Sequence, residues 1–432
     1  MRSGSAVLAL VFAVARGQQD VAAAQDAVAL WRWAAAQGAD VGTVFAAVGA
    51  TGRGVFLRDP PVPTERVLFR LPRRLCLSVA AAGDEVLRAA VGAEAWTRAS
   101  ARFAHFELAS QMDVLALKVA SELLLGEQSF WHPYLAAIAR PATPQYDVAE
   151  ALLGAARRGA AHEGSGAEPA PDPAWPARQV QAIARSRATR AVFRASRCAS
   201  QALDDAALES VEWASLVGDV LKALHPDANA RRDAALLAAG VVRARAVALP
   251  GGDSTALVPI WDMVNHAANG RTVDATLRQS GDFFEYVAAA GTAGEVVHDY
   301  NAQFGCVLDW VLAFGFAPQQ LVDAALRGEP SDGGAPSDGD RGSCAEVALD
   351  GRTYQLPRDE AELRSSHVSL TLRAALAARL AELPTDAALR TAVDADAGSS
   401  GRIAAIVMLH ERIALRRTAA RLGGRRESID SL

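Results

Sequence analysis

Lysine and cysteine are both scarce in this chain. Lys118 and Lys222 are the only lysines among 44 basic residues, and the rest are arginine, a bias that a GC-rich genome produces without any functional cause. The four cysteines are scattered and form no Cys-x-x-Cys pair, so the sequence predicts neither a metal site nor a disulfide framework. The formal net charge of −5 gives no electrostatic reason to expect a nucleic-acid partner.

Long apolar runs are missing as well. No segment is long and apolar enough to be predicted as a membrane-spanning helix, so we expect no membrane partner. At the N-terminus, Met1 and Arg2 precede a short apolar stretch, residues 6–15, that ends in an Ala-x-Ala pattern. Such a stretch is typical of a cleaved targeting segment and equally of a helix that continues into residues 21–33. Residues 1–26 are therefore predicted to be either a targeting segment or an N-terminal helix.

Alanine and other apolar residues are abundant. Hydrophobic residues occupy 51% of the 432 positions and charged residues 22%, so the chain can bury a large core in two or three units. Apolar spacing predicts helices at residues 27–38, 114–125, 180–192, 206–224, 317–326, 359–382 and 403–422. Extended segments are predicted at 41–48, 283–288 and 347–356, surface loops at 160–178 and 328–343, and a helix break at His225-Pro226.

A Gly-x-Gly pair lies at Gly52 and Gly54, ahead of a strand-like segment and a proline-rich bend. On its own such a pair most often marks a tight turn between strands. It has a second meaning, because only glycine lets a main chain come into close contact with a bound ligand. Both meanings stay open from these residues alone.

The stretch from Leu257 to Phe316 organises the rest of the chain. In order it holds an apolar, strand-like run at 257–264, Asn265-His266, a strand at 283–288, the Gly294-Glu295 turn, Tyr300, an amphipathic helix and Phe314-Gly-Phe316. This order resembles the core of the SET-domain protein methyltransferases. More narrowly, it resembles the Rubisco large-subunit lysine methyltransferase class, which also contains actin-histidine methyltransferases. Residues 126–135 are similar to that class's Gly-x-x-Ser-x-Trp-x-Pro-Tyr-Leu phrase.

The resemblance implies an α+β fold. A SET-domain β core would span residues 27–316 and hold a large helical insert at about 84–236. An α-helical C-terminal substrate-binding domain would follow at 317–432. The phrase at 126–135 is mostly aromatic and apolar, so we expect it to pack the insert against the core and assign no chemistry to Trp131 or Tyr134.

The resemblance also implies S-adenosyl-L-methionine as cofactor. The residues that match the family's cofactor site are Gly52, Arg53, Gly54, Arg245, Asn265 and His266. Arg245 would hold the carboxylate of the cofactor's methionine moiety, since a guanidinium meets a carboxylate with two hydrogen bonds. Asp262 matches a family aspartate near the incoming substrate residue. The implied transfer is a single displacement with no metal and no covalent enzyme intermediate.

Tyr300 is the candidate catalytic residue. In the family a tyrosine hydroxyl faces the methyl channel and helps to orient the acceptor, as an in-line transfer requires. The spacing from Gly294 to Tyr300 is one residue shorter than in relatives. A slip of one residue in a strand turns a side chain to the opposite face, so either a bulge restores the direction of Tyr300 or the side chain points away.

The resemblance implies an S-adenosylmethionine-dependent protein N-methyltransferase that acts on protein lysine. Protein histidine is an alternative acceptor. Two further alternatives are a catalytically impaired SET-fold module that binds proteins, and an alanine-rich helical scaffold in which the motifs match by chance. We expect a monomer with a protein substrate, located in the cytoplasm or, if the N-terminus is an import signal, in a plastid.

Overall fold

A computed structural model describes the chain in separate stretches, namely residues 25–49, 52–59, 62–78, 111–138, 144–163, 197–250, 254–266, 275–289, 294–298, 300, 307–327, 346–349, 352–355, 376–377, 379–381, 383–395, 405–409, 411–413, 415–416 and 419. The chain divides into two compact units. The first comprises Met1–Pro141 and Ala214–Tyr300, and the second comprises Ala142–Trp213 and Asn301–Leu432. The long helix α8 (Arg197–Val220) contributes to both.

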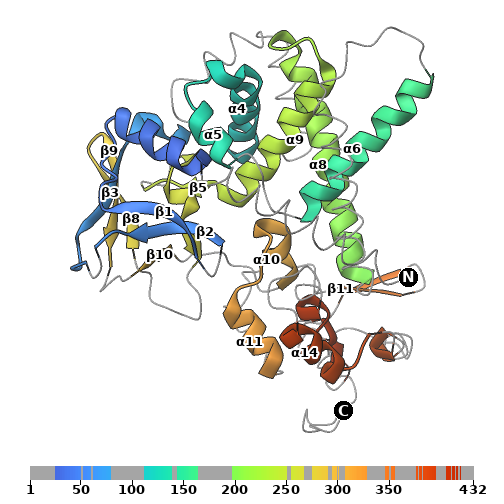
Figure 1. The fold of residues 1–432 in the computed structure, drawn as a ribbon. Helices are drawn as coiled ribbons and strands as arrows, with labels where there is room; N and C mark the ends of the chain where they lie inside the picture. The colour runs from blue at the N-terminus through green and yellow to red at the C-terminus, as the bar shows by residue number, and fades with distance from the viewer. Residues whose placement is uncertain are drawn as a thin grey trace, which may run out of the picture. The chain divides into compact units, whose positions relative to one another are not determined.

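Four described strands of the first unit form one sheet, although they come from distant parts of the sequence. The order is β1 (Val44–Gly49), β2 (Gly52–Leu57), β10 (Glu295–His298) and β7 (Asn265–His266). β1 and β2 pair antiparallel (Figure 1), as do β2 and β10, whereas β10 and β7 pair parallel. Because β10 lies between β2 and β7, the Gly-x-Gly strand and the Asn-His strand flank the same neighbour.

Two three-stranded sheets also belong to the described part of this unit. In one, β9 (Phe283–Ala288) lies between β3 (Val67–Pro72) and β8 (Ala275–Ser280). In the other, β6 (Thr255–Leu257) lies between β4 (Leu77–Ser78) and β5 (Val247–Ala248). The ring centroid of Tyr286 on β9 lies 4.9 Å from that of Phe69 and 4.5 Å from that of Trp261. These aromatic rings fill the core beside the central strand.

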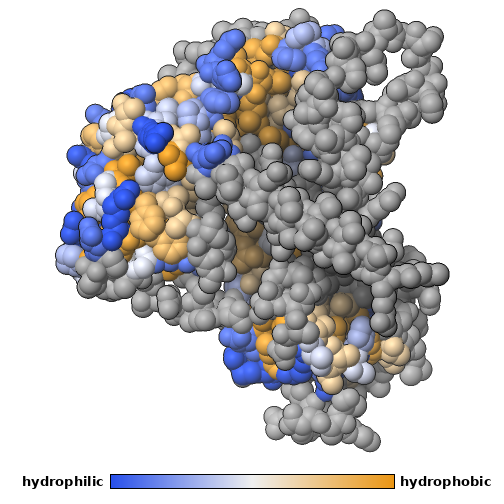
Figure 2. Space-filling model, viewed as in Figure 1, coloured by the Kyte–Doolittle hydropathy of each residue, from blue (hydrophilic) through white to orange (hydrophobic). Residues whose placement is uncertain are grey.

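Helices cover the β core of the first unit. Residues 25–36 form a helix that ends near Gly38, whose φ of +85° suits glycine because it has no Cβ. The helices α4 (Gln111–Leu125) and α9 (Ala228–Arg245) pack against each other, and Figure 2 shows apolar side chains gathered over α4. The shorter helical elements are η1 (Arg73–Leu75), η2 (Gly126–Gln128), α5 (His132–Ile138), η3 (Leu221–Ala223) and η4 (Trp261–Met263).

The break between α8 and α9 has a clear chemical cause. Pro226 follows His225, and the Asp227 side chain then caps the N-terminus of α9 by accepting from the Asn229 backbone N–H at 2.7 Å. The buried Arg231 donates to the carbonyls of His225 and Pro226 at 2.6 and 2.8 Å. The predicted break at His225-Pro226 is confirmed.

The described part of the second unit is mainly helical. Its elements are α6 (Pro144–Glu163), α10 (Val307–Phe314), α11 (Gln319–Arg327), the hairpin of β11 (Glu346–Leu349) and β12 (Arg352–Gln355), and α14 (Asp386–Ala395). The Gln145 amide on α6 donates to the backbone carbonyl of Leu312 on α10. Ring centroids of Trp310, Phe314 and Phe316 lie 5.2 to 6.1 Å apart, so the predicted Phe-Gly-Phe ending closes α10 by aromatic packing.

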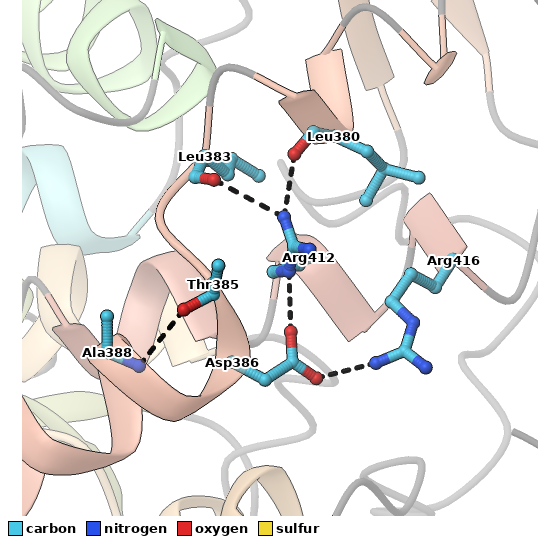
Figure 3. A network of polar contacts seen from close by, with 7 residues as sticks. All are labelled: Leu380, Leu383, Thr385, Asp386, Ala388, Arg412 and Arg416. Carbon is cyan, nitrogen blue, oxygen red and sulfur yellow. Dashed lines mark hydrogen bonds and ion pairs between the residues drawn. The ribbon is translucent and has the colours of Figure 1, made fainter. Parts of the chain in front are cut away.

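An ionic network joins C-terminal segments of the second unit (Figure 3). Asp386 at the start of α14 accepts from Arg412 at 2.5 Å and from Arg416 at 2.6 Å. Arg379, which is 4% exposed, pairs with Glu411 at 2.9 Å. We call these five residues the C-terminal ion cluster. Within it, guanidinium groups meet carboxylates directly, the strongest kind of side-chain hydrogen bond.

The predicted α+β class is confirmed, with a β core and a helical insert. The strand predicted at 283–288 is β9, and the extended segment at 347–356 corresponds to the β11–β12 hairpin. Predictions for residues 1–24, 164–178, 180–192 and 328–343, and for most of 359–382, lie outside the described residues. The domain boundaries remain predictions. In the part of the chain that is described, no helix has both the length and the apolar character to cross a membrane.

Of the two meanings left open for the Gly-x-Gly pair, the tight turn does not apply, because Gly52 and Gly54 lie within β2, opposite Gly49 and Ala47 of β1. One local expectation was wrong. The apolar run at 257–264 is not one strand, because the chain leaves β6 at Leu257 and turns through η4 before β7. Pro259 in this run has no N–H to donate to a sheet, which explains why the strand stops.

Candidate functional site

Gly54, Asn265 and Glu295 meet where β2, β10 and β7 lie side by side. Gly54 is buried, and a Cβ atom at its position would lie 2.6 Å from Glu295 Oε1 and 2.7 Å from Asn265 Nδ2. Real Cβ atoms do not approach other atoms so closely, so only glycine fits there with these side chains in place. Two motifs that are distant in the sequence therefore share one location.

The Asn265 amide is held by a carboxylate. Its Nδ2 donates to Glu295 Oε1 at 2.6 Å, and both side chains are half-buried. The bond fixes the direction of the amide on a strand of only two residues. Glu295 was part of the predicted Gly-Glu turn but was not among the predicted site residues. The signal that could have identified Glu295 was its position in the order of motifs, directly after Gly294.

Tyr300 lies against the Asn-His strand. Its backbone N–H donates to His266 Nδ1 at 3.2 Å, the two ring centroids are 5.1 Å apart, and its hydroxyl donates to the Val264 carbonyl at 3.1 Å. Because Nδ1 accepts this hydrogen bond, the proton of a neutral His266 lies on Nε2. The short spacing from Gly294 thus still brings Tyr300 to the predicted site.

The Tyr300 hydroxyl is a poor base in this environment. Burial raises the pKa of Tyr300 to about 12, while the charge of Arg245 lowers it and that of Asp262 raises it. The phenol is therefore protonated at neutral pH and offers a hydrogen-bond donor and two lone pairs. Such a group can orient a reacting atom, but it cannot remove a proton efficiently.

Arg245, the last residue of α9, reaches the turn that precedes β7. Its Nη1 donates to the Asp262 carbonyl at 2.8 Å and lies 3.8 Å from Asp262 Oδ2. The Tyr134 hydroxyl donates to the same Oδ2 at 2.9 Å. The Asp262 side chain has no exposed surface. We call Tyr134, Asp262 and Arg245 the site cluster.

Tyr134 was not among the predicted site residues, because its phrase was interpreted as packing. Packing is indeed present: the Trp131 indole N–H donates to the Leu75 carbonyl at 3.0 Å, and the Tyr134 ring is fully buried. Burial, followed by the charge of Asp262 and the hydrogen bond to it, raises the pKa of Tyr134 well above its ordinary value. Tyr134 is therefore a neutral, buried donor to a carboxylate.

Gly52 and Arg53 lie on β2 in register with Gly49 and Val48, on the same strand as Gly54. Their side-chain surroundings lie outside what the structure describes, so their predicted contact with a cofactor stays a prediction. Among the residues that are described, no three His, Cys, Asp or Glu side chains gather as metal ligands.

No protein-family model and no curated protein sequence matches the chain. Solved structures do match in fold. The SET domain of LSMT bound to lysine and AdoHcy has a TM-score of 0.54 at 15% identity, covering 93% of this chain and 91% of that one. Rubisco LSMT bound to AdoMet has a TM-score of 0.53 at 16% identity, covering 92% of both chains. The SET domain of LSMT bound to MeLysine and AdoHcy has 0.52 at 14%, covering 92% and 91%. The chain has the SET-domain fold of these proteins, as its motifs predicted.

Proposed function

We propose, from this SET-domain fold, that the chain is an S-adenosylmethionine-dependent protein methyltransferase with protein lysine as its acceptor. The observation that carries the proposal is the meeting of Gly54 and Asn265 beside Glu295, next to the strand end where Tyr300 lies. A bare backbone, an amide and a phenol at one location suit a polar ligand that must be approached closely.

The residues fit the cofactor that the similar structures hold. Gly54 leaves room for the Asn265 and Glu295 side chains beside its main chain, because a Cβ atom at its position would collide with both. Arg245 has a buried Nε that makes no hydrogen bond within the described residues, while its Nη1 donates to Asp262. Its cationic head can meet the carboxylate of an amino-acid moiety. Asn265 and the main chain of His266 would supply the remaining polar contacts.

When bound, S-adenosylmethionine supplies an activated methyl group on a positive sulfonium. In our proposal Tyr300 orients the acceptor nitrogen, because its phenol stays protonated at the pH of the reaction. The acceptor amine must lose its own proton before transfer, and a channel without bulk water favours its neutral form. The Tyr300 proton is donated to the Val264 carbonyl, so its oxygen would accept from the N–H of the acceptor and leave the nitrogen lone pair free to attack. Tyr300 serves as a hydrogen-bond acceptor and a wall of this channel rather than as its base.

The proposal is tested by binding and by transfer. Titration with S-adenosylhomocysteine in a calorimeter should show one site per chain. Incubation with S-adenosylmethionine labelled on its methyl group and a lysate of the source cells should label a protein. Tyr300→Phe should retain binding and lose about 100-fold or more of the transfer rate, since one positioned polar group contributes roughly that factor.

The outcomes separate the candidate functions. Acid hydrolysis of the labelled protein should yield methyl-lysine, and methyl-histidine would replace lysine as the acceptor. Tight binding without any labelled protein would favour a SET-fold module that binds proteins. The absence of binding by the wild-type chain would contradict the proposal as a whole.

A further inference from the structure

The turn at residues 260–264 is strained. Ile260 has a φ of +70°, a conformation that a β-branched residue rarely adopts, and its side chain is fully buried. Directly after it, the Asp262 N–H donates to the Val258 carbonyl and the Met263 N–H to the Ile260 carbonyl, both at 3.1 Å. Strained backbone of this kind persists only where the surroundings hold it in place.

Tyr134 and Arg245 hold this turn from outside. Tyr134 donates to Asp262 Oδ2 from α5, and Arg245 donates to the Asp262 carbonyl from the end of α9. Tyr134 and Asp262 are 128 residues apart in the sequence, so the bond joins two separate parts of the first unit. The helices α5 and α9 are thus both bonded to Asp262 of the turn.

The same turn leads directly into the proposed site. The Val264 carbonyl accepts from the Tyr300 hydroxyl at 3.1 Å, and Asn265 and His266 follow as β7. A shift of Asp262 would move this carbonyl and the start of the strand together. The position of the Tyr134 hydroxyl therefore affects the Val264 carbonyl and β7, although the hydroxyl contacts neither of them.

We propose that Tyr134 is a positioning residue, which sets the cofactor site through Asp262. The inference rests on the proposed function, since it assigns Tyr134 to that site. Asp262 then acts chiefly inside the protein, where its carboxylate joins a phenol to a guanidinium. Removal of the Tyr134 hydroxyl would take a donor from a fully buried carboxylate oxygen, and the turn would relax away from the geometry that β7 needs.

The test compares two phenylalanine substitutions. Tyr134→Phe removes the donor to Asp262, and Tyr286→Phe is the matched control. Tyr286 is as fully buried in the same unit, and its hydroxyl donates to a backbone carbonyl, that of Val297, at the longer distance of 3.4 Å. Tyr134→Phe should weaken binding of S-adenosylhomocysteine about tenfold, the usual effect of one lost buried partner, whereas Tyr286→Phe should stay within about twofold. Thermal unfolding should place both variants within a few degrees of each other.

A double-mutant cycle separates positioning from general destabilisation. Asp262→Ala, which removes the acceptor, should weaken binding at least as much as Tyr134→Phe does. The double variant should bind about as weakly as the weaker single variant, because both changes remove the same hydrogen bond. Independent losses that multiply would overturn the inference, as would equal affinities for Tyr134→Phe and Tyr286→Phe. If Tyr134→Phe does not fold, an unchanged affinity in Asp262→Ala overturns it. Failure of the wild-type chain to bind would remove the proposed function as well.

Discussion

The site cluster of the first unit and the C-terminal ion cluster of the second use similar groups in different settings. Each joins distant segments through arginine and a carboxylate. In the site cluster the carboxylate has no exposed surface and shares its oxygen with a phenol. In the ion cluster, Asp386 is 23% exposed and joins two arginines of a neighbouring segment. The site cluster lies just before β7, a strand with proposed ligand contacts, whereas the C-terminal ion cluster joins helical segments.

This difference shows that the chemistry of a cluster does not reveal its role. In both clusters, the arginine–carboxylate pair restricts the conformation of the segments that it joins. What separates the two is the element that follows the pair. After Asp262 come Asn265 and His266, whereas after Asp386 comes the regular helix α14. Variants in the two regions should therefore separate ligand binding from stability.

Gly54→Ala should have the largest effect. The added Cβ would lie 2.6 Å from Glu295 Oε1 and 2.7 Å from Asn265 Nδ2, so the hydrogen bond between these side chains must break. Both atoms are ends of flexible side chains, and we expect only about 1–3 kcal/mol of lost stability. Binding of S-adenosylhomocysteine in a calorimeter should fall below detection.

Gly42→Ala is the control for this substitution. A Cβ at Gly42 would meet only Asp40 Oδ1 at 3.7 Å, which is ordinary contact. Its affinity should match that of the wild-type chain. If Gly54→Ala bound the ligand as well as Gly42→Ala, the shared location of the two motifs would have no functional meaning.

Asp386→Ala should lower stability without touching the site. The change leaves Arg412 and Arg416 without their common carboxylate (Figure 3). The groups are partly exposed, so we expect a loss of about 2 kcal/mol, between the values for surface and buried pairs. Chemical denaturation measures the loss, and the affinity for S-adenosylhomocysteine should not change. Thr391→Ala, on an exposed part of the same helix, should remain close to wild type.

Alkaline pH should weaken the first unit through its buried tyrosines. The folded pKa of Tyr300 is about 12 and its ordinary value is 10. A raised pKa means that its contribution is fully present below pH 10 and is lost as pH rises through 12. By pH 11 the loss should reach about 1 kcal/mol from this residue.

A comparison of wild type with Tyr300→Phe isolates the part of this alkaline loss of stability that comes from Tyr300. Urea unfolding at pH 8 and pH 11 should show a smaller alkaline loss in the variant, because it has no phenol to ionise at this position. An equal loss in both proteins would mean that Tyr300 does not keep its proton in the folded state.

The sequence was most informative where chemistry restricts the choice of residue. Gly54 must be glycine because of its neighbours, and Asn265 and Tyr300 belong to an ordered set of motifs. The resemblance carried by these motifs predicted that the residues share one site, and the structure brings them together. Order along the chain compensated for the low specificity of each motif alone.

The rest of the site could not be predicted, because it depends on contacts across long sequence separations. Tyr134 lies in an aromatic phrase that was interpreted as packing, and its partner Asp262 is 128 residues away. Apolar periodicity carries no information about such a pair. The apolar run before β7 hid a turn for a similar reason: hydrophobic character predicts burial, whereas the left-handed conformation of Ile260 depends on its surroundings.

A substitution at Glu65 should have the smallest effect on stability, and Glu65 contrasts with Ile260 in its surroundings. It shares a positive φ with Ile260, at +64°, but its side chain is 75% exposed and its ion pair with Arg278 is long, at 3.5 Å. The backbone N–H of Glu65 donates to the Ala288 carbonyl, a bond that glycine keeps. Glu65→Gly should therefore raise stability in urea by about 0.5–1 kcal/mol, since relief of the left-handed strain exceeds the added chain entropy. Its affinity for S-adenosylhomocysteine should equal that of wild type. A loss of stability instead would show that the strain at Glu65 is negligible, and would weaken the view that Ile260 needs the site cluster to hold it.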